Sequence, residues 1–152
     1  MKRQKHIVIA TDGSGGGRAA VDEGLALAES MKASVTFVSV RPVPSPVLGH
    51  PYYERALAKE LERSRAALAE GVGLADERGI PCAAETLEGD PAEAIATLAR
   101  ERDADLIVVG SRGLGRFKSV LLGSVSTEIV RRAGRPVFVV RDHAAVPASN
   151  AA

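Results

Sequence analysis

The sequence predicts an α/β protein of one domain, built on an open parallel β-sheet with helices on both faces. Its 152 residues are enough for one domain of ordinary size. Short runs rich in β-branched residues alternate with longer segments of helical periodicity, which favours parallel strands joined by right-handed crossovers. Three of the short runs are almost continuously apolar, which is typical of strands covered on both faces.

Five runs are predicted as strands because they are short, β-branched and bounded by turn residues. They span residues 6–12, 34–40, 81–87, 105–111 and 136–140. The single cysteine, Cys82, falls in the third run, where we expect a small buried side chain. A lone cysteine cannot form a disulfide within the chain, and the sequence has no CxxC or paired-histidine pattern that would indicate a metal site.

Four segments show the three-and-four spacing of amphipathic helices. In the first, 16–33, the apolar stripe consists of Val21, Leu25, Ala28 and Met31. In the second, 52–78, it consists of Leu57, Leu61, Leu68, Val72 and Ala75. Gly79 is expected to cap the second helix at its C-terminus, and Asp90 with Pro91 to begin the third. The fourth is expected to run from near Gly123 to near Gly134.

The loop and tail segments indicate a single folded unit, residues 1–141, followed by a tail. The segment 41–51 holds four prolines and is expected to be a loop, because both of its flanks belong to one alternation of strands and helices. Residues 142–152 lack periodicity, so we expect a disordered tail.

Charge and hydropathy exclude several classes of partner. The chain has 20 basic and 19 acidic residues, so we expect no nucleic-acid partner. The first apolar run stops at Thr11 and Asp12, too early for a signal peptide or a membrane span. We therefore expect a cytoplasmic protein without a membrane partner.

The segment "GSRGLGRFKSVLLGSVS", residues 110–126, has the features of a phosphate-binding loop. It joins a strand to the N-terminus of a helix, where free N–H groups and the helix dipole favour an anion. Its glycines allow the backbone to take positive φ and to approach a ligand, while its serines can serve as caps or phosphate ligands. Positive charge comes from Arg112, Arg116 and Lys118. On the residues alone, an ordinary long turn with Ser124 as N-cap remains the alternative.

Other phosphate signatures do not match. The segment lacks the Gly-Lys-Ser/Thr ending of a Walker A loop. The second glycine cluster, "DGSGGGR" at 12–18, has Arg18 where a dinucleotide-binding pattern requires glycine. Arg18 and Ala19 also replace the aspartate and serine of an ATP pyrophosphatase loop.

Taken together, these motifs resemble the universal stress protein family. The nucleotide-binding branch of that family is marked by Gly-x2-Gly-x9-Gly-Ser/Thr, which Gly110, Gly113, Gly123 and Ser124 match at every spacing. "IVIATDGS" resembles the family's first strand and its aspartate, "GDPAEAI" the entry to its third helix, and "GRPVFVV" its last strand. The resemblance covers residues 5–141.

The resemblance implies a sheet of strand order 3-2-1-4-5 and a homodimer. It also implies ATP, alone or with bound Mg²⁺ or Mn²⁺, at the ends of strands 1 and 4. The residues implied around the nucleoside are Ala10, Thr11, Asp12, Val40 and Val109. Those implied around the phosphates are Gly110, Gly113, Gly123, Ser124, Val125 and Ser126. Arg112 and Arg116 are added as phosphate partners on their charge alone.

Three functions are compatible with this site. The first is an ATP-binding regulatory module of the stress response, the second a slow ATPase or nucleotidyl-transfer enzyme, and the third a structural dimer without ligand. An efficient hydrolase needs a group that orients water and a firm metal site. The loop offers neither acid nor histidine, and His6, His50 and His143 are expected to be solvated. These observations favour the binding module.

The last strand predicts how two copies associate. In the implied strand order it lies at one edge of the sheet, and an apolar edge strand is usually covered. Its residues Val137, Phe138, Val139 and Val140 contain no charge that would block pairing. We therefore expect a two-fold homodimer in which these strands pair antiparallel.

Overall fold

The computed structural model describes residues 2–111 and 122–141 and contains one sheet of five parallel strands. The strands are β1 (His6–Ala10), β2 (Ser34–Arg41), β3 (Cys82–Glu88), β4 (Leu106–Gly110) and β5 (Val137–Val140). They lie in the order β3-β2-β1-β4-β5, and every pairing is parallel. The predicted fold class and strand order are confirmed.

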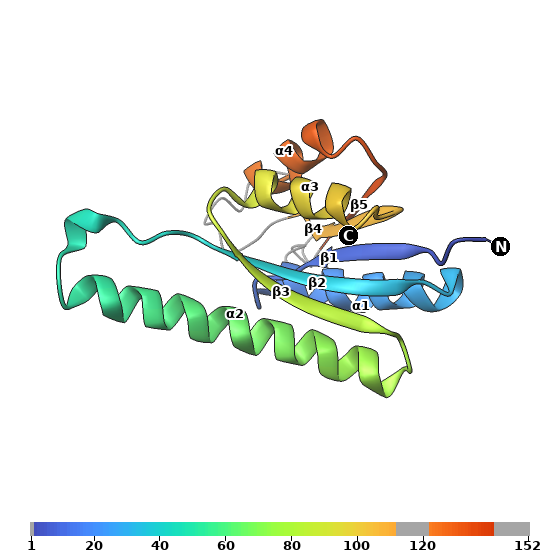
Figure 1. Ribbon diagram of the computed structural model, residues 1–152, viewed down its shortest axis with the longest axis horizontal. Helices are drawn as coiled ribbons and strands as arrows, with labels where there is room; N and C mark the ends of the chain where they lie inside the picture. The colour runs from blue at the N-terminus through green and yellow to red at the C-terminus, as the bar shows by residue number, and fades with distance from the viewer. Residues whose placement is uncertain (1, 112–121, 142–152) are drawn as a thin grey trace, which may run out of the picture.

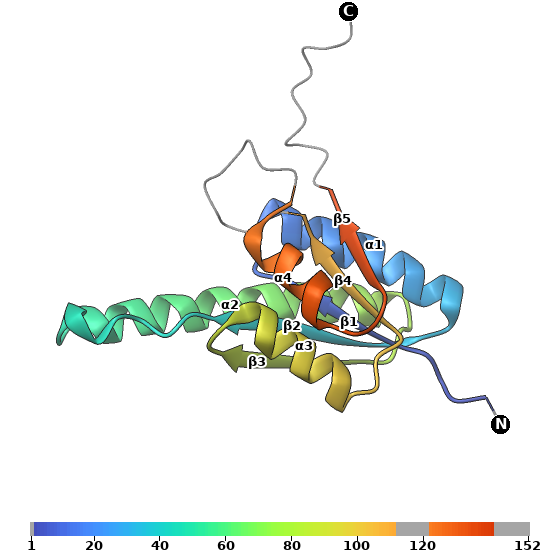
Figure 2. The same ribbon diagram turned by 90° about the horizontal axis from the view of Figure 1, so that it is seen from above.

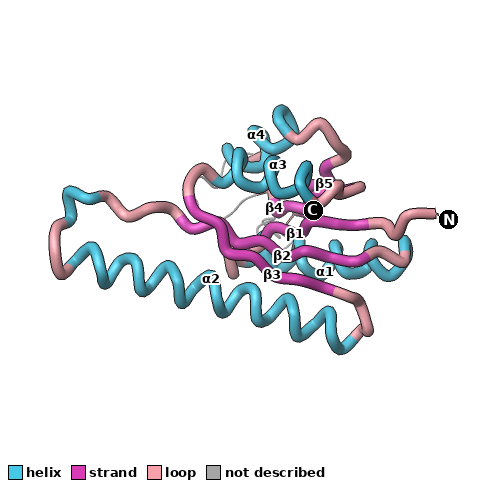
Figure 3. Tube along the Cα trace, viewed as in Figure 1, coloured by secondary structure: helices cyan, strands magenta, loops and turns pink. Residues whose placement is uncertain are grey.

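Helices cover both faces of the sheet (Figures 1 and 3). They are α1 (Gly15–Met31), α2 (Tyr52–Glu77), α3 (Pro91–Glu101) and α4 (Ser124–Arg132). On one face α1 and α2 pack on Ile7, Ile9 and Phe37. On the other, α3 and α4 pack on Val8 and Ile107. Because successive strand residues point to opposite faces, the continuous apolar run of β1 supplies both cores.

The ends of the elements differ from the predicted ends by one or two residues. β1 ends at Ala10, not at residue 12, because the Asp12 carboxylate accepts hydrogen bonds from Ser14 and bends the chain into a turn. Ser14 then caps α1 by accepting from the Gly17 N–H at 3.1 Å. Cys82 is the first residue of β3 and is half-buried.

The predicted helix caps of the middle of the chain are confirmed. Gly79 follows α2 with φ of 68°. The N–H groups of Gly79 and Ile80 donate to Asp76 and Ala75 at 3.1 and 2.9 Å, the two bonds of a Schellman motif. Asp90 accepts from the Glu93 N–H at 3.0 Å, and Pro91 begins α3.

The prediction of one continuous core stripe along α2 is wrong for the first half of the helix. None of the residues from Tyr52 to Arg63, all of which the structure describes, is buried; Leu57 is half-buried and Leu61 is 40% exposed. Burial begins at Ser64, whose hydroxyl lies 2.8 Å from that of Ser39 on β2. The earlier half projects past the sheet together with the chain that leads into it (Figures 1 and 2). We call residues 42–63 the arm; it includes a short 3-10 helix, η1 (Pro46–Leu48).

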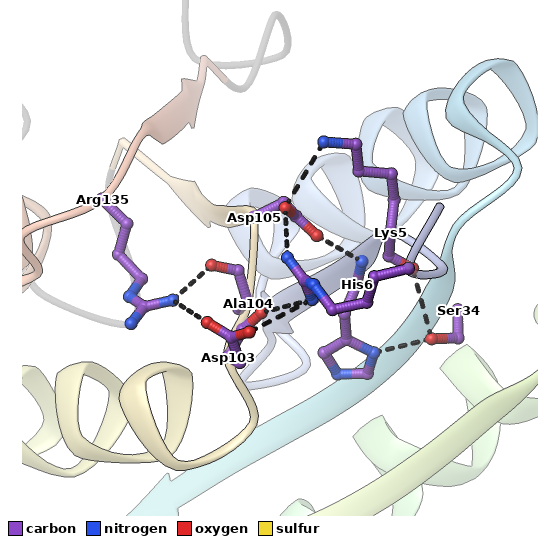
Figure 4. A network of polar contacts seen from close by, with 8 residues as sticks. Lys5, His6, Ser34, Asp103, Ala104, Asp105 and Arg135 are labelled. Atoms are coloured by element: carbon purple, nitrogen blue, oxygen red, sulfur yellow. Dashed lines mark hydrogen bonds and ion pairs between the residues drawn. The ribbon is translucent and has the colours of Figure 1, made fainter. Parts of the chain in front are cut away.

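At the amino ends of β1 and β4, His6 belongs to a polar network (Figure 4). The prediction that His6 is solvated is therefore wrong. The His6 ring lies 2.7 Å from the Ser34 hydroxyl and 2.9 Å from the Thr36 hydroxyl. Burial, followed by the positive charge of Arg102, lowers the pKa of His6. The backbone N–H of His6 donates to Asp105 at 2.8 Å, so the side chain of Asp105 joins β4 to β1.

Among residues 2–111 and 122–141, no helix combines the length and the apolar character that crossing a lipid bilayer requires.

Candidate functional site

The sheet reverses its direction of winding between β1 and β4. The chain passes from β1 to β2 on one side and from β4 to β5 on the other. The loops after β1 and β4 therefore diverge, and such a switch point leaves a crevice at the carboxyl ends of the two strands. The turn after β1 and the glycine-rich segment both begin there.

Three predicted nucleoside residues share one face of the sheet at this end. Ala10, Val40 and Val109 come from β1, β2 and β4, and all three pack on the side of α3 and α4. Val109 is 4% exposed, whereas Ala10 and Val40 are half-buried. They form an apolar floor beneath the carboxyl edge, which is suited to the face of a flat, apolar ring.

The turn after β1 holds Asp12 in a defined position. The buried Thr11 extends the sheet by donating its N–H to the Val38 carbonyl at 2.9 Å. Asp12 then accepts from the Ser14 N–H and from its hydroxyl, both at Oδ1. Within the described residues Oδ2 has no hydrogen-bond partner, so one carboxylate oxygen is left for a ligand.

The two ends of the glycine-rich segment lie together. Ser111 donates its N–H to the Val140 carbonyl at 2.7 Å and accepts from the Gly123 N–H at 2.6 Å. The hydroxyl of Ser126 is directed at the carbonyls of Ser111 and Gly123, at 3.2 and 3.0 Å. Ser126 is 3% exposed. Ser126 is the third residue of α4, so it is not the helix N-cap, and its hydroxyl braces the two ends of the segment.

The N-terminus of α4 faces outward at the same edge. Gly123 is the N-cap residue, with φ of −67°, and Ser124 is the first residue of the helix. The alternative interpretation, in which Ser124 is an ordinary N-cap, is therefore wrong. Ser124 is exposed and Val125 is 39% exposed. The first N–H groups of a helix have no partner within it, so this end presents donors and a positive dipole end to a ligand.

Close packing in the fold requires glycine at position 110, and the sequence did not reveal this requirement. Neither Gly110 nor Gly123 uses the positive φ that glycine allows. A Cβ at Gly110 would lie 2.6 Å from the carbonyl oxygen of Gly16, in the first turn of α1. A Cβ at Gly17 would lie 2.8 Å from Asp12 Oδ1. Both glycines let α1 pack closely on the ends of β1 and β4.

The remaining predicted site residues lie outside the described part of the chain. They are Arg112, Gly113 and Arg116, as well as Lys118. His143 and the predicted tail, 142–152, also lie outside it.

Two hollows among the described residues lie away from the crevice. One, of about 440 Å³, lies between β3 and α3 and is lined by Glu85, Glu88, Asp90, Glu93 and Glu101 together with apolar residues. Its carboxylates would repel a phosphate. The other, of about 350 Å³, lies in the arm. No group of three or more histidine, cysteine or acidic side chains suited to a metal ion occurs in residues 2–111 and 122–141.

A family comparison agrees with this architecture. The universal stress protein family matches residues 4–141. This chain belongs to the universal stress protein family. A curated relative, a universal stress protein of Thermus aquaticus, is 42% identical over 139 residues, which are 90% of this chain and 98% of the relative.

Solved structures of the same family share the fold. The universal stress protein UspA of Lactobacillus plantarum is 25% identical, with a TM-score of 0.82 over 93% of this chain and 100% of that one. A universal stress protein solved in complex with cAMP is 27% identical, with a TM-score of 0.67 over 93% of this chain and 99% of that one.

Proposed function

We propose that this universal stress protein is an ATP-binding regulatory module of the stress response, with the nucleotide in the crevice between β1 and β4. The observation that carries the proposal is the convergence of three unlike features at one edge. These are the apolar floor, the free oxygen of Asp12 and the N-terminus of α4. An adenine nucleotide has a matching part for each: a flat base, a ribose with hydroxyl donors, and anionic phosphates.

Each part of the nucleotide has a proposed set of contacts. The base lies on Ala10, Val40 and Val109, and the backbone around Thr11 borders it. Asp12 accepts a hydrogen bond from the ribose. The phosphates take their proposed contacts from Gly110, Arg112, Gly113, Arg116, Gly123, Ser124, Val125 and Ser126.

Two further observations support this arrangement. The spacing of Gly110, Gly113, Gly123 and Ser124 matches the nucleotide-binding branch of the family. A family member 27% identical to this chain was solved with cAMP, which is also an adenine nucleotide. Mg²⁺ or Mn²⁺ bound to ATP would be held by the phosphate oxygens, because the one free oxygen of Asp12 is assigned to the ribose.

Replacing Gly123 by valine tests the proposal. With φ of −67° and ψ of 163°, Gly123 has a backbone conformation that valine adopts readily, so we expect the variant to fold. The valine side chain would occupy the space in front of the α4 N-terminus. We expect calorimetry to show ATP affinity reduced at least about tenfold, which is 1.4 kcal/mol.

A matched control is Gly73→Val on α2, where a Cβ meets nothing within 4 Å. It should bind ATP as the wild type does. Unchanged affinity in a folded Gly123→Val variant would remove the glycine-rich segment from the site.

We also propose that two copies pair through β5. This strand lies at the edge of the sheet, and its Phe138 is 41% exposed. Antiparallel pairing of two β5 strands would satisfy their outward N–H and C=O groups and cover Phe138. Light scattering on the wild type and on Val139→Lys tests this. A dimer that survives the lysine, or a wild-type monomer at high micromolar concentration, would show that the edge is protected otherwise.

A further inference from the structure

The arm exposes several large apolar side chains to solvent. Its exposed large side chains are Val43, Val47, Leu48, Tyr52 and Leu61, and Val47 is 92% exposed. It projects from the carboxyl end of β2, where no strand lies beneath it (Figures 1 and 2). Exposed apolar surface gathered on one projection indicates a contact surface.

One line of exposed residues runs along the arm and reaches its base. Glu54, Ala58, Leu61 and Arg65 are all exposed and follow one another at spacings of four, three and four. These are the spacings of a coiled-coil seam, so the four side chains lie on one face of α2. The seam has an acid at its outer end, a base at its inner end and two apolar residues between them.

We propose that this seam binds the same seam of a second copy of the chain, with the two α2 helices antiparallel about a two-fold axis. In that pairing Glu54 faces Arg65 of the other copy, and Ala58 faces Leu61. A two-fold axis repeats each contact, so two Glu54–Arg65 ion pairs lie on either side of two contacts between Ala58 and Leu61. A parallel pairing would instead place Glu54 against Glu54 and Arg65 against Arg65.

The hollow in the arm fits the incoming arginine. It has a volume of about 350 Å³, and Val43, Pro44, Pro46, Tyr53 and Glu54 contribute to its lining. Proline and tyrosine surfaces suit the aliphatic stem of an arginine, and a carboxylate suits its head. Glu54 Oε1 lies 2.9 Å from His50 Nε2, while Oε2 has no partner among the described residues. Arg65 forms no ion pair within the described part of its own chain, so it is available to the other copy.

This contact is separate from the proposed pairing through β5. β2, which leads into the arm, and β5 lie on opposite sides of β1 in the sheet. The seam is short compared with interfaces that bury about 800 Å² on each partner, so we expect association at hundreds of micromolar.

Charge reversal provides the test, with mass measured by sedimentation equilibrium at hundreds of micromolar. Glu54→Arg and Arg65→Glu each place like charges opposite one another, so each should lower the weight-average mass to that of the species without the seam contact. The combined variant Glu54→Arg/Arg65→Glu restores opposite charges and should restore the mass. Arg55→Glu, an exposed change away from the seam, should leave it unchanged.

A loss of mass is expected whether or not β5 also pairs. Without that pairing the seam variants should be monomers; with it, the seam would join β5 dimers into larger species, and the seam variants should be β5 dimers. Repeating the series with Val139→Lys separates the two contacts. A wild-type monomer, equal masses in all variants, or a combined variant whose mass stays at that of the single variants would each overturn the proposal.

Discussion

Two turns at the carboxyl edge of the sheet contain glycines, and they use them differently. In the turn after β1, Gly17 lets α1 approach Thr11 and Asp12. In the segment after β4, Gly110 serves the same packing, because it faces Gly16, whereas Gly123 lies at an outward-facing helix N-terminus. A glycine between a strand and a helix therefore serves either close packing or access for a ligand, and its surroundings decide which.

The largest effect on stability is expected from Gly110→Ala. Its Cβ would meet the backbone of Gly16 at 2.6 Å, and backbone cannot rotate aside as a side chain can. Overpacking of this kind typically costs about 1–3 kcal/mol. Urea denaturation should show a lower midpoint with the slope unchanged.

The matched control is Gly73→Ala in α2, where a Cβ meets nothing within 4 Å. Alanine is the better helix former, so we expect stability unchanged or raised by up to about 1 kcal/mol. Equal stability of the two variants would show that the contact between Gly110 and Gly16 does not constrain the fold.

The next largest effect is expected from Asp12→Asn, and it concerns binding. A hydrogen bond to a charged group contributes about 1.5–3 kcal/mol, so ATP affinity should fall at least about tenfold. Asparagine keeps an oxygen that accepts from Ser14, so the turn should remain folded. Asp22→Asn, an exposed change on α1, should bind ATP normally in the same calorimetric titration.

A smaller effect is expected from Asp105→Asn at the opposite edge. Burial tends to raise the pKa of Asp105, but the His6 N–H and the charges of Arg3 and Lys5 outweigh it, so the pKa lies below its ordinary value of 3.8. A depressed pKa stabilises the fold at neutral pH, and the contribution disappears as pH falls through the folded-state value.

Urea denaturation at pH 7 should therefore show Asp105→Asn less stable than the wild type, with a difference that shrinks as the pH falls below about 4. Asp103→Asn, at a side chain that is 71% exposed, is the control. A difference that stays constant with pH would mean that the loss is not electrostatic.

The smallest signal is expected from hydrolysis. Among the described residues His6 lies at the amino end of β1 and His50 in the arm, so neither approaches Asp12 as a general base. Phosphate release should be well below the roughly 1 to 1000 per second of typical enzymes. Rapid release that disappears with Asp12→Asn would favour the ATPase.

Local patterns predicted the fold because its determinants are local. Asp90 with Pro91 and the position of Gly79 after α2 each depend on a few neighbouring residues. The contact between Gly16 and Gly110 and the lack of cover over Leu61 depend on segments far apart in the chain, so periodicity could not reveal them. For the site, the family resemblance placed Ala10, Val40 and Val109 together, and they do share one face of the sheet; the inward bonds of Ser126 were not foreseen.

The central claim is that the turn after β1 and the N-terminus of α4 form one nucleotide site. The most direct test is to titrate the isotope-labelled chain with ATP and follow its backbone amide signals by NMR. We expect saturable shifts in both Ala10–Gly13 and Gly123–Ser126, with the signals of His6 and of the arm unchanged. Shifts confined to one of the two segments, or centred on the acidic hollow between β3 and α3, would contradict the account.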